Sequence, residues 1–206
     1  MHVRMNMLTG DPGQLDQAIR YAETTIRPNV EGQPGNRGLA VLANAELGTS
    51  VVATYWDSAD AMSASDQAVQ VSRKEVTELV KGTVTVEHYE VPVFVRRSRP
   101  GPGAGVRITR LDGSPGGLGA AVEEFRRTAV PALTEMRGLC SAQSGVDHAT
   151  GRCIVVVAFE DMDALAASRA GAAGLRAGMA ALAHLTVRGV EEYRLVFSSV
   201  RAGDTE

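Results

Sequence analysis

The stretch VRMNMLTGDPGQLDQAIRYAETTIRP at residues 3–28 occurs a second time in the chain, as VRITRLDGSPGGLGAAVEEFRRTAVP at residues 106–131. The two segments align without a gap at an offset of 103, and ten of the 26 pairs are identical. Unrelated segments would share roughly one or two residues, so the match indicates an internal duplication. The same offset relates residues 48–65 to residues 151–168, which extends the duplication over most of the chain.

The segment between the two copies, RRSRPGPGAG, is rich in Arg, Pro and Gly, a composition typical of a linker. We therefore predict a first repeat at residues 1–95, a linker at 96–105, a second repeat at 106–200 and a short tail at 201–206.

Each copy predicts the same series of elements. In the first copy we expect strands near residues 2–8, 37–45, 49–56 and 83–93, with helices after the first and third strands. The second copy repeats this pattern, and its last strand is expected near 186–198.

Proline residues mark the first helix of each copy. Asp11 and Ser114 are expected to cap these helices, each followed by a proline at the first helical position. Pro28 and Pro131 are expected to end the same helices or to follow their last turn.

The order β-α-β-β-α-β is that of the ferredoxin-like unit, an antiparallel sheet with its helices on one face. The strands VVATYW (51–56) and CIVVVAF (153–159) are apolar at nearly every position, which is typical of strands buried on both faces. Helices can cover only one face, so we expect the other copy's sheet to cover the second. The sequence thus predicts an α+β fold in which two ferredoxin-like repeats pack their sheets into an intramolecular α+β barrel.

The composition excludes several classes of partner. The chain is 44% hydrophobic with a net charge of −3, so it lacks the basic surface expected of a protein that binds nucleic acid or an anionic membrane. No segment approaches the roughly 18 apolar residues of a membrane span, and the N-terminal residues lack the apolar run of a signal peptide. We expect a cytoplasmic protein in which Cys140 and Cys153 are reduced and half-buried on strands.

The run PGNRGLAVLANAELGTSVVATYWDSADAMSAS at residues 34–65 resembles the core of the antibiotic biosynthesis monooxygenase-like family, within the dimeric α+β barrel superfamily. Residues 138–168 of the second copy resemble it more loosely. Members of the family are usually single ferredoxin-like units that pair as homodimers, so the resemblance implies that this chain holds both halves covalently. Whether two such chains form a further homodimer is left open by the sequence.

The resemblance implies several activities that particular residues help to separate. Some members oxidise polycyclic quinols or anthrones with oxygen and without metal or flavin, some degrade haem, and many have no assigned activity. Asn6 lies on the first strand, where haem-degrading relatives place an Asn. Their Trp falls on Ser65 and their axial His on Lys74, or on Ser168 and Ala177 in the second copy. Haem binding without an axial ligand loses its main anchor, so we expect no haem.

Oxygenation without a cofactor requires a base that generates a substrate anion and donors that hold the substrate oxygens. We expect Asn6 and His88 to be catalytic, and Tyr55, Trp56 and Tyr89 to contact the substrate. A histidine can take a phenolic proton near neutral pH, and amide or phenol groups can orient a quinol. Structural alternatives stay open: the rings can be part of the core, His88 can be solvated, and a backbone group can satisfy the Asn6 amide.

The remaining polar residues give weaker signals. The four histidines are scattered without the spacing of metal ligands, so no metal and no other cofactor is expected. Arg4 and Arg107 recur at the same strand position, which favours structural ion pairs over an anion site.

We therefore predict a cofactor-independent monooxygenase that acts on a small apolar or aromatic molecule, of the polycyclic phenol or quinol type. The pocket is expected between the sheet and the helices of the first copy. The alternative is a non-catalytic ligand-binding or stress-related protein on the same scaffold.

Overall fold

The structure is a computed structural model that describes residues 1–201. These residues divide into two compact units: unit 1 contains Met1–His88 and the residues from Tyr193 onward, and unit 2 contains Tyr89–Glu192. The predicted tail lies outside the described residues except for Arg201. No helix within residues 1–201 is long and apolar enough to cross a membrane.

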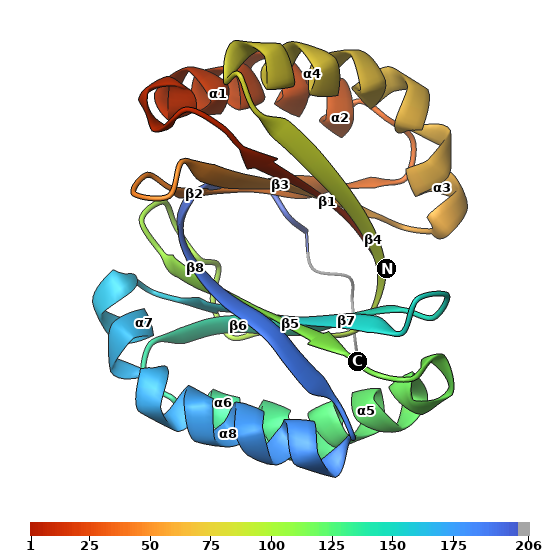
Figure 1. Ribbon diagram of the computed structural model, residues 1–206, viewed down its shortest axis with the longest axis vertical. Helices are drawn as coiled ribbons and strands as arrows, with labels where there is room; N and C mark the ends of the chain where they lie inside the picture. Colours follow the sequence, from red (N-terminus) through yellow and green to blue (C-terminus); the bar gives the residue numbers. More distant parts are fainter. Residues whose placement is uncertain (202–206) are drawn as a thin grey trace. The chain divides into compact units, whose positions relative to one another are not determined.

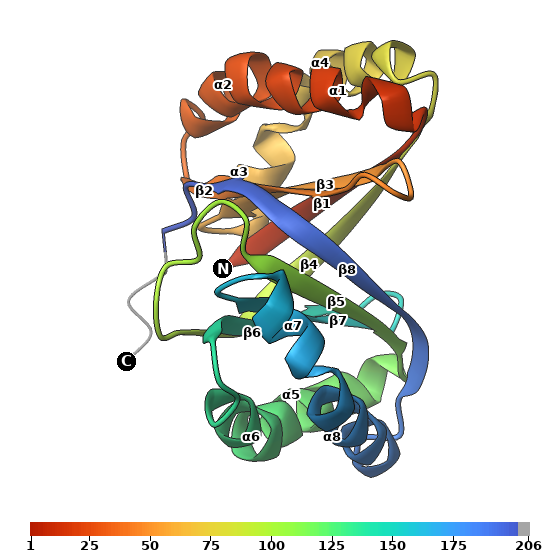
Figure 2. The same cartoon turned by 90° about the vertical axis from the view of Figure 1, so that its left-hand side faces the viewer.

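Unit 1 is an antiparallel sheet with helices along one face (Figures 1 and 2). Strand β3 lies between β1 and β2 and is antiparallel to both. The elements that begin in this unit are β1 (His2–Thr9), α1 (Leu15–Tyr21), α2 (Arg27–Glu31), β2 (Asn36–Asn44), β3 (Thr49–Trp56), α3 (Ala59–Ala64), α4 (Asp66–Leu79) and β4 (Thr83–Arg96).

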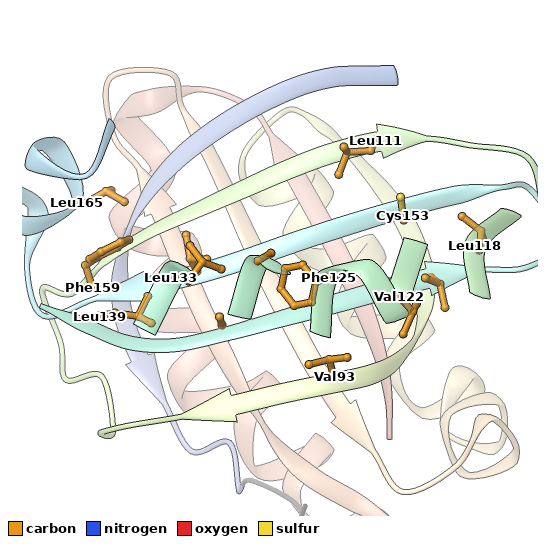
Figure 3. Close-up of a cluster of buried hydrophobic side chains, with 14 residues drawn as sticks. Val93, Leu111, Leu118, Val122, Phe125, Leu133, Leu139, Cys153, Phe159 and Leu165 are labelled. Carbon is orange, nitrogen blue, oxygen red and sulfur yellow. The ribbon is translucent and has the colours of Figure 1, made fainter. Parts of the chain in front are cut away.

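Unit 2 repeats this arrangement, with β7 antiparallel to both β5 and β6. Its helices pack a cluster of apolar side chains against the sheet, and Phe125 lies near the middle of that cluster (Figure 3). The elements that begin in this unit are β5 (Gly105–Asp112), α5 (Leu118–Glu124), α6 (Val130–Thr134), β6 (Leu139–Asp147), β7 (Arg152–Phe159), α7 (Met162–Ala167), α8 (Arg169–Leu182) and β8 (Thr186–Ser198).

The last strand of each repeat extends into the sheet of the other repeat. The end of β8 pairs with β2, where Phe197 lies opposite Val41, and the end of β4 pairs with β6, where Phe94 lies opposite Gln143. The hydrogen-bonded strand order is β1-β3-β2-β8-β5-β7-β6-β4, a closed barrel. The predicted fold class is confirmed.

The strands are buried on both faces, as their continuous apolarity predicts. Arg4 and Thr54 lie on the face that carries the helices and are 0% and 2% exposed. Val3 and Tyr55 point to the opposite face and are 1% and 5% exposed. Side chains on a strand alternate between faces, so these values require that both faces are shielded from water.

The first helix of each repeat continues past the proline that was expected to end it. A π-helical turn at Ala22–Ile26 joins α1 to α2, and a second at Phe125–Ala129 joins α5 to α6. Proline lacks an N–H group, and its ring crowds the carbonyl four residues earlier. The wider π-helical turn accommodates both effects, so the helix continues. The prediction that Pro28 and Pro131 end these helices was wrong.

The expected helix caps differ between the repeats. Oδ1 of Asp11 accepts a hydrogen bond from the backbone N–H of Gly13 at 2.9 Å, which confirms that cap. The side chain of Ser114 caps nothing, and its own carbonyl accepts from the N–H of Gly117 instead. The expectation for Ser114 was wrong.

Candidate active site in unit 1

A cavity lies between the sheet and the helices of unit 1. Its volume is about 40 Å³. Apolar side chains of β1, β2, β3, α1 and α4 form most of its wall. Its polar lining residues are Arg4, Asn6, Ser50, Thr54, Ser72 and Arg73.

Asn6 is fixed in the cavity wall by hydrogen bonds at both ends of its amide. Its Nδ2 donates to the carbonyl of Val52 at 3.2 Å, and its Oδ1 accepts from Nε of Arg73 at 2.9 Å. Arg73 is itself held by Asp66, whose Oδ1 accepts from Nη2 at 3.0 Å. Within residues 1–201 the second N–H of Asn6 has no acceptor, and it remains available to a ligand.

Arg4 is a fully buried cation beside this network. Its Nη1 donates to Oγ of Ser65 at 2.9 Å, and its Nη2 donates to the carbonyl of Met62 and lies 3.1 Å from Oδ1 of Asp66. Burial lowers the pKa of Arg4, and the nearby Asp66 carboxylate opposes that shift. Ser65, which occupies the position of the haem-binding relatives' Trp, therefore serves to hold a buried guanidinium.

His88 contacts Arg4, at the edge of these hydrogen bonds. Its side chain is exposed, and its Nε2 accepts a hydrogen bond from Nε of Arg4 at 3.4 Å. Asn6 and Arg4 both line the cavity, whereas His88 does not. The structure thus brings Asn6 into the cavity and leaves the second expected catalytic residue outside the lining.

The three aromatic residues expected to contact substrate are buried, and none of them lines the cavity. Trp56 is part of the apolar core of unit 1, and its Nε1 donates to Oγ1 of Thr54, which does line the cavity, at 3.0 Å. Tyr55 points to the opposite face of β3. Tyr89 belongs to unit 2, where it lies beside Gly145.

Sequence reasoning missed Arg73, the residue that orients Asn6. A signal for it exists, because Arg73 recurs as Arg176 at the offset of 103 that also relates Arg4 to Arg107. Both arginines lie on helices, whereas the site residues predicted from the sequence lie on strands. Lys74, at the position of the relatives' axial His, is exposed and lies 3.9 Å from Glu78. Within residues 1–201 no cluster of His, Cys, Asp and Glu could hold a metal ion.

Unit 2 contains a second cavity at the equivalent place. Its volume is about 90 Å³. Most positions that line it match those of unit 1 at the offset of 103, including Arg107 for Arg4, Thr109 for Asn6 and Arg176 for Arg73. The duplication has therefore produced two related cavities whose polar groups differ.

The buried arginine of unit 2 is neutralised by a carboxylate. Arg107 is 3% exposed and donates to Oγ of Ser168 at 3.0 Å, to the carbonyl of Leu165 at 3.0 Å and to Oε1 of Glu192. Burial acts to raise the pKa of Glu192, but hydrogen bonds from Arg169 and Arg107 outweigh it, so the pKa is lowered. The expectation of a structural ion pair is confirmed for Arg107.

Comparison of the sequence with protein families gives a match to antibiotic biosynthesis monooxygenase over residues 1–86. These residues include every residue that lines the unit 1 cavity.

Two relatives occur in Mycobacterium tuberculosis. The uncharacterized protein Rv2558 is 28% identical over 202 residues, which cover 98% of this chain and 86% of that protein. The uncharacterized protein Rv2557 is 26% identical over 169 residues, which cover 82% of this chain and 75% of that protein. The similarity to Rv2558 thus extends through both repeats.

Solved structures share the fold at low sequence identity. A candidate monooxygenase of Fusobacterium nucleatum superposes with a TM-score of 0.68 at 13% identity, covering 98% of this chain and 95% of its own. An anthrone oxidase-like protein gives a TM-score of 0.66 at 14% identity, covering 96% of this chain and 92% of its own. At such identities the likeness establishes the fold alone.

Proposed function

We propose that this chain, whose first repeat carries an antibiotic biosynthesis monooxygenase domain, is a cofactor-independent monooxygenase with its active site in the unit 1 cavity. The observation that carries the proposal is the position of Asn6, a polar amide fixed in a largely apolar wall with one N–H free of any acceptor among the described residues. An amide in such a place can hold the oxygen of a phenol or quinol.

The proposed substrate is a polycyclic phenol, quinol or anthrone that loses a proton and then reacts directly with O₂. For an anthrone, the ring CH₂ becomes a carbonyl: one oxygen atom of O₂ stays on the carbon and the other leaves as water with the two hydrogens. The guanidinium of Arg73 favours the substrate anion, because opposite charges attract strongly where water is excluded. The free N–H of Asn6 stabilises the same negative oxygen.

His88 is the proposed acceptor of the substrate proton. Its neutral ring accepts from Arg4, so it can take a proton only if that contact opens or if a water molecule relays the proton. Trp56 is proposed to act indirectly, by fixing Thr54 in the wall. For Tyr55 and Tyr89, substrate contact remains a prediction from the sequence.

A polycyclic substrate needs more room than the cavity offers in the described conformation. A cavity of about 150 Å³ holds a single benzene ring, and the unit 1 cavity is smaller. We therefore propose that α4 moves away from α1 when substrate enters. The hydroxyl of Tyr21, at the end of α1, donates to Glu75 on α4, and this hydrogen bond must break during the movement.

Oxygen consumption tests the proposal. The protein is expected to consume O₂ with members of a panel of anthrones and quinols, and Asn6→Ala is expected to lower kcat at least 100-fold. Thr109→Ala, the equivalent change in unit 2, serves as the matched control and should retain activity. A protein whose melting temperature rises with these compounds but which consumes no O₂ would instead be the ligand-binding protein of the alternative prediction.

A further inference from the structure

The unit 2 cavity contains a cation without a counter-ion. Arg107 and Arg176 line this cavity, and no Asp or Glu does. Arg107 is neutralised by Glu192. Arg176 is half-buried, and among the residues that the structure describes it forms no hydrogen bond and no ion pair. A guanidinium that is partly removed from water without a partner is energetically unfavourable unless an anion joins it.

The difference between the repeats explains why Arg176 is unpaired. Its counterpart Arg73 binds both Asn6 and Asp66, and the second repeat has Thr109 and Arg169 at those positions. The carboxylate of unit 2 is instead Glu192 on β8, and it binds Arg107 and Arg169. Glu192 therefore neutralises Arg107 and Arg169, and Arg176 is left in the cavity wall without a counter-ion.

Two hydroxyl groups in the same wall also lack partners. Ser144 is 5% exposed, and its Oγ is enclosed without a hydrogen-bond partner. Thr109 is 7% exposed, and its side chain forms no hydrogen bond within residues 1–201. Ser144 lies opposite Val155, whose side chain also lines the cavity, so it stands on the face of the sheet that carries the helices. Buried polar groups are normally satisfied, and here a ligand could satisfy them.

We propose that the unit 2 cavity binds a small monocarboxylate with an apolar body, with its carboxylate on Arg176 and on the hydroxyls of Thr109 and Ser144. The planar guanidinium fork matches a carboxylate in a two-point hydrogen bond. The rest of the wall is almost entirely aliphatic and aromatic, including Phe125 (Figure 3), and suits a hydrocarbon body. The site is independent of the oxygenase chemistry proposed for unit 1.

The volume limits the ligand to a short chain or a single ring. The cavity of about 90 Å³ is smaller than the roughly 150 Å³ that accommodates benzene, but it is partly open to solvent, so the end of a ligand farthest from Arg176 can lie outside it. Hexanoate and benzoate are therefore suitable probes, and hexanamide is the neutral analogue of hexanoate with nearly the same shape.

Isothermal titration of the full chain tests the site. Hexanoate or benzoate should bind, and hexanamide should bind at least tenfold more weakly than hexanoate. Arg176→Gln should weaken hexanoate binding at least tenfold and leave hexanamide binding unchanged. Arg127→Gln removes the same charge from a side chain that is 73% exposed and absent from the cavity wall, and it should change the hexanoate affinity by less than twofold.

A second variant tests the hydroxyl contact. Ser144→Ala should weaken hexanoate binding about tenfold, because a hydrogen bond to a charged group is lost, while the melting temperature of the free protein rises. The proposal is overturned if neither carboxylate binds, if hexanamide binds as tightly as hexanoate, or if Arg176→Gln leaves the affinity within twofold of the original. If phenyl phosphate binds more tightly than benzoate, the site prefers a phosphate to a carboxylate, and the proposal is also overturned.

Discussion

Nε of Arg73 donates a hydrogen bond to Oδ1 of Asn6 across 2.9 Å, joining helix α4 to strand β1 inside unit 1. The two residues are 67 positions apart in the sequence. Asp66 forms an ion pair with the same guanidinium and so fixes its position. The Asn6 amide is therefore oriented by the Arg73–Asp66 pair as well as by the carbonyl of Val52. The repeat without this carboxylate leaves its equivalent arginine, Arg176, unpaired.

Replacement of Asn6 should reduce stability as well as activity. Asn6→Ala leaves Nε of Arg73 and the carbonyl of Val52 without their partner, and we expect the free energy of unfolding to fall by about 1–2 kcal/mol. Thr109→Ala removes no hydrogen bond and one buried methyl group, so it should cost less than Asn6→Ala, at most about 0.8 kcal/mol. Urea denaturation measures both values, and an equal loss in the two variants would contradict the role given to Arg73.

The hydrogen bond between Tyr21 and Glu75 should restrain the opening of the unit 1 cavity. Burial raises the pKa of Tyr21, and the hydrogen bond to Glu75 raises it further, so the phenol stays protonated and keeps donating at neutral pH. Tyr21→Phe removes this contact and should increase the association rate of a quinol about threefold or more, measured by stopped-flow fluorescence of Trp56. An unchanged rate would indicate that substrate enters without separating α1 from α4.

Glu192 should make the stability of the protein depend on acid pH. Its pKa is lowered in the folded state, so the unfolded chain binds the proton more tightly and stability rises with pH. This contribution is complete above pH of about 4.5 and is lost as the pH falls through the lower folded value. Glu192→Gln should cost about 3 kcal/mol at pH 7, because Arg107 is left buried and unpaired.

The neighbouring Glu191 provides the control for that prediction. It pairs with Arg110 at 2.9 Å and is 36% exposed, so Glu191→Gln should cost less than about 1 kcal/mol. The Glu192→Gln variant should also show a flatter dependence of stability on pH below 4.5. If the free energy of unfolding depends on pH in the same way for the original protein and this variant, Glu192 is not the group responsible.

Cys153 should be an unreactive thiol despite its place in a cavity wall. Burial raises its pKa to about 11, with a smaller contribution from the Asp112 carboxylate. At pH 8 only about 0.1% of such a group is thiolate, so alkylation by iodoacetamide should be about 100-fold slower than for an exposed cysteine.

The measurement uses Cys140→Ser, which leaves Cys153 as the only thiol of the chain. Its alkylation rate, followed by mass spectrometry, should rise about tenfold per pH unit between pH 8 and 10. A rate that is independent of pH would mean that opening of unit 2, rather than thiolate formation, limits the reaction. Both cysteines are buried rather than half-buried, so the expectation from the sequence was wrong on this point.

The sequence by itself determined the duplication, the β-α-β-β-α-β order and the burial of strands on both faces. Short sequence patterns determine these properties: the repeat at an offset of 103 and the continuous apolarity of segments such as residues 51–56. Only the tertiary structure decided which polar groups share a cavity. Asn6 meets Arg73 while His88 stays outside the lining, because such contacts depend on strand register and on the rotation of α4 over the sheet, and neither is encoded in a short stretch of chain.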